Sequence, residues 1–124
     1  MKEIAFFGDK GSFDNMVKVF GELGCNKGVL CMRNSVVCDY KNIEFALVEV
    51  PGHSYFYEAE TMVGESDNIG IIQNDMAKVI NDLRLSIFGD EEYFSYVKTL
   101  NLEANEVFDY SAYRDNYFKK RFGI

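Results

Sequence analysis

Acidic and tyrosine residues gather in the middle of the chain, where their types and spacing suit recognition chemistry. Residues 42–77 contain seven carboxylates and no Lys or Arg. Carboxylates form charge-assisted pairs with Arg and Lys, while Tyr supplies contact area with few rotatable bonds. The stretch is therefore either a solvated acidic surface or a surface that binds a basic protein, and we adopt the second interpretation. The predicted partner-binding residues are Glu49, His53, Tyr55, Tyr57, Glu58, Glu60, Glu65 and Asp67.

His53, the only histidine, lies beside Ser54 and close to Glu49 in the sequence. These residue types would suit a metal site or an acid–base pair, and a Ser-His-Asp triad using Ser54 or Ser35 can be written. A single His without ligands at fixed spacing is a weak basis for a metal site, and no G-x-S-x-G segment supports a triad. We predict that His53 lies at a protein interface, and we assign no catalytic residue, no metal ligand and no cofactor.

The segment GDKGS at residues 8–12 offers an alternative chemistry. A glycine-containing turn between a strand and a helix N-terminus holds anions on backbone N–H groups. The full G-x-x-x-x-G-K-[ST] spacing is not present, and Asp9 and Asp14 would repel a phosphate. We expect a plain strand-to-helix turn here, and a small-molecule-binding or small enzymatic domain that uses this turn is the alternative function.

The same region carries a local family resemblance. IAFFGDKGSF, residues 4–13, resembles the N-terminal I-A-[FY]-L-G-P-x-G-[ST]-F motif of prephenate dehydratases, and FALVEVPGHS is similar to their later G-V-V-P-I-E-N-S segment. Asp9 stands at the proline of the motif, and no Thr-Arg-Phe catalytic segment is present. The resemblance therefore carries over no catalytic residue, and we interpret it as a shared strand-turn-helix solution.

Length and composition favour one globular domain over residues 1–124 with a single core. Hydrophobic residues make up 48% of the chain and include eleven Phe and eight Tyr, which is ample material for that core. The formal net charge is -7, and because basic residues concentrate at the C-terminus, residues 1–113 carry 9 basic and 19 acidic groups. Such a surface repels nucleic-acid phosphates and anionic lipid and attracts basic proteins.

Cysteine usage and the N-terminus indicate the compartment. Cys25, Cys31 and Cys38 are odd in number and form no Cys-x-x-Cys pair, so we expect three reduced thiols packed as small apolar residues. The opening MKEIAFF lacks the long apolar region of a signal peptide, and no apolar run approaches the length of a membrane span. These features predict a cytoplasmic protein without membrane or direct nucleic-acid partners, and they leave the oligomeric state open.

Hydrophobic periodicity predicts an α+β fold with a mainly antiparallel sheet of about four strands. Within residues 43–50, the middle part, residues 45–48, is apolar on both faces. We therefore expect it to be buried on both faces and to be the central strand, which Pro51 ends. The segment 33–35 reads as the turn of a hairpin, and residues 55–63 as either a short helix capped by Ser54 or an ordered loop. The predicted strands are 3–7, 28–32, 36–39 and 43–50, and the predicted helices are 13–23, 69–88, 91–101 and 111–121. We expect Ser12 to cap the first helix and Gly24 to end it, and Asp67 or Asn68 to cap the second and Gly89 to end it.

A compact acidic, Tyr-rich chain without a catalytic motif is typical of an inhibitor, and its profile resembles that of toxin immunity proteins. We expect a non-enzymatic immunity protein or antitoxin that neutralises a basic toxin, with a nuclease as the favoured target. Beside the small-molecule alternative, a third interpretation is a phage-encoded inhibitor or an assembly subunit, in which the tyrosine-rich C-terminal helix would be an oligomer contact.

Overall fold

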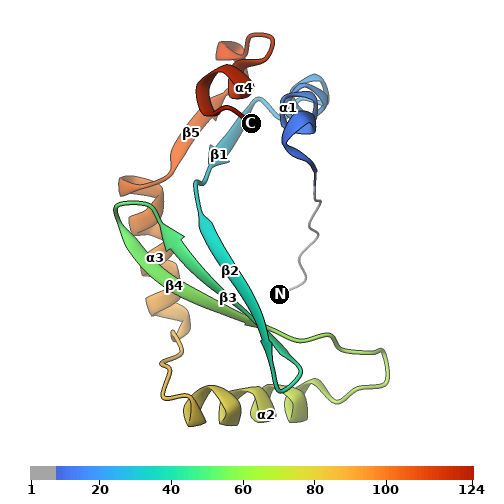
Figure 1. Ribbon diagram of the computed structural model, residues 1–124, viewed down its shortest axis with the longest axis vertical. Helices are drawn as coiled ribbons and strands as arrows, with labels where there is room; N and C mark the ends of the chain where they lie inside the picture. Colours follow the sequence, from blue (N-terminus) through green and yellow to red (C-terminus); the bar gives the residue numbers. More distant parts are fainter. Residues whose placement is uncertain (1–7) are drawn as a thin grey trace. The chain divides into compact units, whose positions relative to one another are not determined.

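The computed structural model describes residues 8–124, and the expected strand over residues 3–7 lies outside the described residues (Figure 1). The chain divides into two compact units, which we call the terminal unit (residues up to 30 and 106–124) and the central unit (residues 31–105). All strand pairs within the described residues are antiparallel, and helices accompany both sheets. The predicted α+β class is therefore confirmed.

The central unit contains a three-stranded sheet in the order β2-β3-β4. Its strands are β2 (Asn34–Tyr40), β3 (Ile43–Val50) and β4 (Ser54–Glu60). Lys41 and Asn42, both with positive φ, form the two-residue turn of the first hairpin. Pro51 followed by Gly52 at φ 69° forms the next turn, where the His53 N–H donates to the Val50 carbonyl at 2.9 Å, as in a type II turn. The central place of β3 and its end at Val50 are as predicted.

The predicted hairpin around residues 33–35 is wrong. β1 (Lys27–Leu30) pairs with β5 (Glu106–Asp109) near the C-terminus, while β2 pairs with β3. Between β1 and β2, Arg33 donates hydrogen bonds to the Met32 carbonyl and to Asn105, each at 2.7 Å. The segment between the two strands is not a hairpin turn, because β1 and β2 pair with different strands. A pairing partner more than 70 residues away cannot be recognised from local turn signals.

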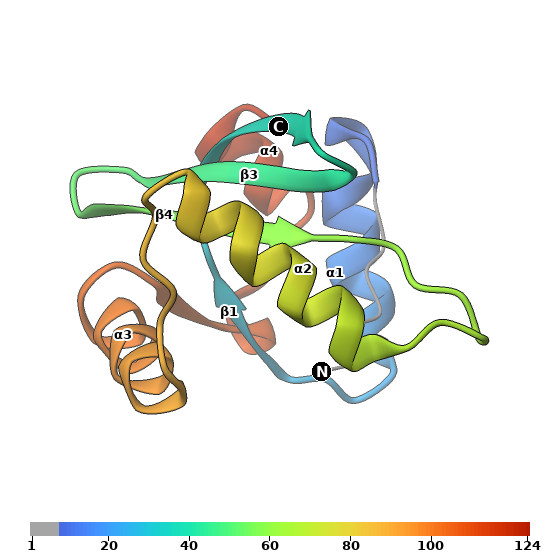
Figure 2. The same ribbon diagram turned by 90° about the horizontal axis from the view of Figure 1, so that it is seen from below.

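Residues 45–48 of β3, expected to be buried on both faces, are buried only in part. Ile43 and Phe45 are buried on one face, Val48 and Val50 on the other, and Leu47 is 52% exposed. The reason is that a helix covers only one end of β3 on each face of the sheet. α2 (Ile69–Asp82) lies over β3 and β4 (Figure 2), and its Ile80, Met76 and Val79 pack with Ile43 and Phe45. α3 (Asp90–Glu103) packs Tyr96 against Phe56 on the opposite face, with ring centroids 5.8 Å apart.

Residues 54–60 form strand β4, where the sequence favoured a short helix or a loop. Seven residues of β4 pair in register with β3, from Ser54 opposite Val50 to Glu60 opposite Glu44. Tyr and Phe have high strand propensity, and pairing with the central strand β3 favours a strand here over the predicted short helix or loop. Ser54 does not cap a helix, because its hydroxyl bonds to Tyr96 of α3 instead.

Two helix boundaries differ from the prediction for local reasons. α2 ends at Asp82 and not at residue 88, because Arg84 adopts a left-handed conformation with φ 56°. Its N-terminus is capped as predicted, since the Asn68 side chain accepts from the Ile71 N–H at 3.2 Å. α3 spans Asp90–Glu103, slightly longer than expected, and the Glu92 carboxylate accepts from the Gly89 N–H at 2.8 Å. This is one of the two bonds of a capping box, because the Gly89 N-cap has no side chain to make the other.

In the terminal unit, α1 (Phe13–Glu22) follows a short 3-10 turn, η1 (Lys10–Ser12), and ends before Gly24 at φ 94°, as predicted. The predicted helix 111–121 is wrong: a 3-10 turn, η2 (Tyr110–Ala112), precedes α4 (Tyr117–Phe122), and left-handed Asn116 separates them. None of the helices within residues 8–124 combines the length and apolar character needed to cross a membrane.

Gly21, within α1, permits close packing of Tyr110. A Cβ atom at this position would lie 2.4 Å from the Tyr110 ring, closer than any real contact. Replacing Gly with Ala in a helix normally gains about 1 kcal/mol. For Gly21→Ala we expect the opposite sign, a loss of about 1 to 3 kcal/mol, because the ring must be displaced. Urea unfolding followed by far-UV circular dichroism measures this difference, and Gly11→Ala, whose Cβ meets nothing closer than 3.7 Å, is the control. A stabilised Gly21→Ala variant would contradict the packing.

Candidate protein-binding surface

The strand register of the central unit places carboxylates from three strands on one face of the sheet. Residues directly opposite each other project to the same face, and side chains alternate along each strand. Asp39 of β2 is opposite Glu44 of β3, and Glu44 is opposite Glu60 of β4. Glu58 lies two residues before Glu60, so it projects to the same face. All four residues are exposed, and we call them the acidic face.

Asp39, Glu44 and Glu60 form a row across the sheet in which like charges lie directly opposite each other on neighbouring strands. Directly opposite residues of neighbouring strands have Cα atoms about 4.5 to 5.5 Å apart, and opposed like charges are destabilising. Asp39, Glu44 and Glu60 take part in none of the ion pairs formed within residues 8–124. Lys41, in the adjoining turn, places its Nζ 5.3 Å from the centre of the Tyr40 ring. The fold therefore carries an electrostatic cost at this face.

The predicted partner-binding residues do not form one surface. Glu58 and Glu60 lie on the acidic face, whereas Glu49, Tyr55 and Tyr57 project to the opposite face of the sheet. The Glu49 carboxylate accepts hydrogen bonds from the Asn34 amide at 3.0 Å and from the Tyr55 hydroxyl at 3.3 Å. These side chains border an apolar groove whose lining includes Val36, Leu47, Tyr55 and Tyr57.

Tyr57 is held in this groove by its hydroxyl, which donates to the Ser86 carbonyl at 2.5 Å. Burial raises the pKa of the Tyr57 hydroxyl above its ordinary value. The hydroxyl therefore stays protonated and keeps donating at neutral pH. Tyr57 thus fastens the segment after α2 to the sheet, which is a structural role.

Glu65 and Asp67 lie in the loop between β4 and α2. Both are exposed, but Asp67 is hydrogen-bonded within its own loop. Its carboxylate accepts from the Gly64 N–H at 2.6 Å, and its own N–H donates to the Gly64 carbonyl at 3.2 Å. Asp67 therefore shapes the loop before α2. Glu65 remains an exposed carboxylate outside the acidic face.

His53 joins the β3–β4 turn to the C-terminal end of α3. Its Nδ1 lies 2.8 Å from Ser54 Oγ and its Nε2 lies 2.8 Å from a Glu103 carboxylate oxygen. This is the Ser-His-carboxylate order of a triad, but with Glu103 as the acid. A nucleophilic serine must present its hydroxyl to a substrate, whereas Ser54 Oγ lies 2.6 Å from the Tyr96 hydroxyl. The chain of bonds fastens α3 to the sheet, and Glu103 and Tyr96 are partners that sequence spacing did not reveal.

The turn at residues 8–12 is held by hydrogen bonds between its own residues. The Ser12 N–H and hydroxyl both donate to the Asp9 carbonyl, at 3.1 and 2.9 Å. The Ser12 side chain makes no capping bond to α1, so the N-cap expected there is not formed. The turn joins directly onto α1, while the strand expected before it lies outside the described residues. The expectation of buried thiols is also wrong, because all three cysteines are exposed.

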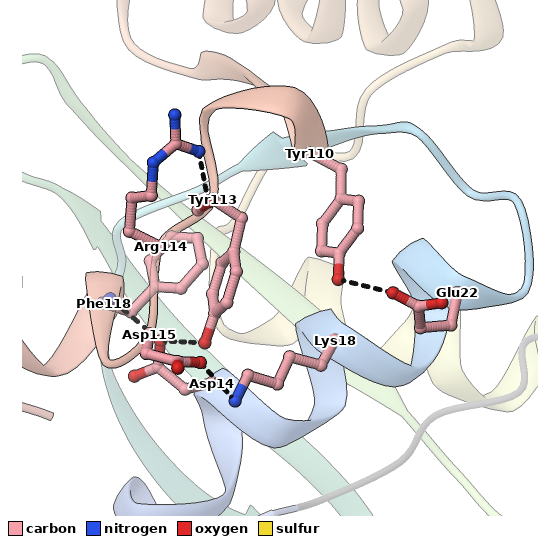
Figure 3. A network of polar contacts seen from close by, with 8 residues as sticks. All are labelled: Asp14, Lys18, Glu22, Tyr110, Tyr113, Arg114, Asp115 and Phe118. Atoms are coloured by element: carbon pink, nitrogen blue, oxygen red, sulfur yellow. Dashed lines mark hydrogen bonds and ion pairs between the residues drawn. The ribbon is translucent and has the colours of Figure 1, made fainter.

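A polar network lies in the terminal unit around the buried Asp14 (Figure 3). Asp14 is only 8% exposed, and its carboxylate accepts from the backbone N–H groups of Phe118 at 3.1 Å and Lys119 at 3.0 Å. The Tyr113 hydroxyl donates to it at 3.0 Å. Asp14 therefore acts as the N-cap of α4, because Asn116, at the capping position, makes no side-chain cap bond. This contact spans 104 residues, so sequence analysis missed it.

Two basic residues of the C-terminal segment, Arg114 and Arg121, form hydrogen bonds or ion pairs with residues of the same unit. Arg121 forms a two-pronged pair with Glu106, with one N–O distance of 2.8 Å. Arg114 donates to the Ser111 and Tyr113 carbonyls, at 3.1 and 2.7 Å. Lys18 pairs with Asp115 at 2.6 Å across an exposed surface. These contacts stabilise the fold locally.

Within residues 8–124, no group of three or more His, Cys, Asp or Glu side chains is arranged to hold a metal ion. The carboxylates of the acidic face therefore stand side by side without converging on a point. Comparison of the chain with models of protein families, with curated proteins and with solved structures finds no match. The acidic face and the apolar groove are thus the two surface features of the central unit that could bind a partner.

Proposed function

We propose that this chain is a non-enzymatic inhibitor that binds a basic protein through its acidic face. The observation that carries the proposal is the row of Asp39, Glu44 and Glu60, three exposed carboxylates abreast on neighbouring strands. A fold gains nothing from opposed like charges, since such pairs lower stability. A partner rich in Arg and Lys removes this cost on binding, because each carboxylate then accepts charge-assisted hydrogen bonds.

The partner is a protein whose own ligand is an anion, and a nuclease-type toxin fits this description best. A nuclease surface carries Arg and Lys to hold phosphates. A row of carboxylates about 4.8 Å apart from strand to strand presents negative charge to such a surface in place of phosphates. The net charge of -7 adds long-range attraction and speeds association at low ionic strength. In this role the chain resembles a cytoplasmic immunity protein or antitoxin, and a phage-encoded inhibitor would use the same chemistry.

Glu44→Lys separates this proposal from a merely solvated surface. Glu44 is the middle of the row, so Lys at this position faces a carboxylate on each side and should stabilise the fold by a few tenths to about 1 kcal/mol. The same change should weaken binding to a basic partner at least about tenfold, because it reverses a charge at the centre of the contact. Gain of stability with loss of binding is the expected signature.

The measurement compares proteins retained by the immobilised wild-type chain and by Glu44→Lys, followed by titration calorimetry with the basic protein that only the wild type retains. Glu65→Lys is the matched control, since it makes the same charge change at an exposed site outside the acidic face. Binding should weaken with salt for the wild type. Equal retention of every basic protein by wild type, Glu44→Lys and Glu65→Lys would refute the proposal.

A further inference from the structure

Within residues 8–124, β2 pairs on one side only, with β3, and is an edge strand of the central sheet (Figure 1). All seven of its residues are exposed, and its sequence NSVVCDY contains neither Lys nor Pro. An edge strand with unpaired backbone groups is a template for another strand, and natural edges are usually protected by charges, proline or bulges. Within the described residues the opposite edge is β4, which carries Glu58 and Glu60. β2 carries one charge, Asp39.

The turn geometry determines which backbone groups of β2 point outward. In a hairpin with a two-residue turn, the residues flanking the turn form a hydrogen-bonded pair, and such pairs then alternate along the ladder. Tyr40 and Ile43 flank the Lys41-Asn42 turn. Tyr40 and every second residue before it therefore bond to β3. The N–H and C=O groups of Ser35, Val37 and Asp39 point away from β3, and residues 8–124 supply no backbone partner for them.

We propose that two copies of this chain pair through antiparallel β2 strands, with the two-fold axis at Val37. In this register Val37 faces Val37 of the second copy, and Ser35 faces Asp39, so the three outward residues of each copy form about six backbone hydrogen bonds. Val36 would face Cys38 on the other side of the sheet. Val36 and Val37 are 67% and 56% exposed, so pairing covers two apolar side chains per copy.

Charge favours a second copy as the occupant of this edge. The one carboxylate of β2 meets a serine hydroxyl, which donates to it, and no like charges are opposed. The two Asp39 residues are four positions apart along the paired strands, or about 14 Å, beyond the Debye length of about 8 Å at physiological salt. The proposal is independent of the proposed function, because pairing at the edge leaves the acidic face of each copy open.

Cross-linking tests the register directly. In the full chain with Cys25, Cys31 and Cys38 replaced by Ser, Val37→Cys would place two thiols on residues whose Cα atoms are about 5.5 Å apart, within the range of a disulfide. We expect covalent dimers on mild oxidation. Asp39→Cys in the same background is the control, since its partner would be too distant. Equal cross-linking of the two variants, or none with Val37→Cys, would overturn the register.

Sedimentation velocity of the full chain tests the pairing itself. The wild type should show a dimer whose fraction rises with concentration, and Val37→Lys, which opposes two ammonium groups at the axis, should shift it towards monomer at least about tenfold in dissociation constant. Val37→Thr keeps a β-branched side chain and should remain dimeric. Far-UV circular dichroism checks that each variant folds. A wild type that stays monomeric, including one whose edge accepts a strand from another protein, would refute the proposal.

Discussion

Asp14→Ala is expected to lower the free energy of unfolding by about 2 to 4 kcal/mol, since hydrogen bonds to a charged group contribute about 1.5 to 3 kcal/mol each and are not additive. The substitution removes the acceptor of three hydrogen bonds and leaves the N–H groups of Phe118 and Lys119 without a partner in a partly dry environment. It also removes the negative charge from the N-terminus of α4. Urea unfolding followed by tyrosine fluorescence and circular dichroism measures the loss.

The same carboxylate gives the protein an acid-dependent stability. Burial of Asp14 raises its pKa, but the hydrogen bonds from Lys119, Phe118 and Tyr113, with the nearby Lys18 charge, outweigh burial and hold the pKa below its ordinary value of 3.8. The native state therefore binds this proton less readily than the unfolded state. The stabilisation is fully present above pH 3.8 and is lost as the pH falls through the lower native pKa.

Asp14→Asn and Asp115→Asn separate this role from general surface charge. Asn keeps an acceptor oxygen at position 14 but has no charge to titrate, so Asp14→Asn should lose less stability than Asp14→Ala and should not share the wild-type loss below pH 3.8. Asp115 pairs with Lys18 at a side chain that is 80% exposed, and its replacement should change stability little. Equal effects at positions 14 and 115 would show that the cap is unimportant.

The parts of the fold that sequence analysis predicted are those determined locally. α1 and α2 follow a 3.6-residue apolar period with recognisable stop or cap residues, Gly24 and Asn68, and β3 is an apolar run ended by Pro51. The pairing of β1 with β5 and the start of α4 depend on contacts between distant segments. β4 has a helix-compatible pattern that is overridden by its ladder with β3. Local patterns carry no information about such contacts.

The site was predicted in part for the same reason. Glu58 and Glu60 share a face because they are two residues apart on a strand, whereas Tyr55 and Tyr57 alternate to the other face. Treating this segment as helix or loop hid that separation. Asp39 and Glu44 were missed, although a signal existed: Lys41-Asn42 between two apolar runs predicts a two-residue hairpin, which sets Asp39 opposite Glu44. Asp14 and Glu103 act on distant segments, and no spacing in the sequence links them to their partners.

Phe118→Ala is expected to have the largest effect on stability, a loss of about 3 to 5 kcal/mol, because it leaves a cavity in a small core. Phe118 is fully buried, and its ring centroid lies 4.9 Å from those of Phe13 and Phe108. These rings come from α1, α4 and β5, so one side chain joins three elements of the terminal unit. Among the described residues of this unit, Phe108 is the one other buried hydrophobic side chain, so little else can absorb the loss.

Two further variants show whether the core position or the residue type matters. Phe20→Ala makes the same chemical change in α1 at a side chain that is 54% exposed, and it should cost much less than Phe118→Ala. Phe118→Leu leaves a smaller cavity and should lie between the two. Denaturant unfolding at equilibrium gives all three values under one set of conditions. Equal destabilisation by Phe20→Ala and Phe118→Ala would show that the core of the terminal unit does not depend on Phe118. It would also remove the reason for expecting the hydrogen bond from the Phe118 N–H to Asp14 to matter for stability.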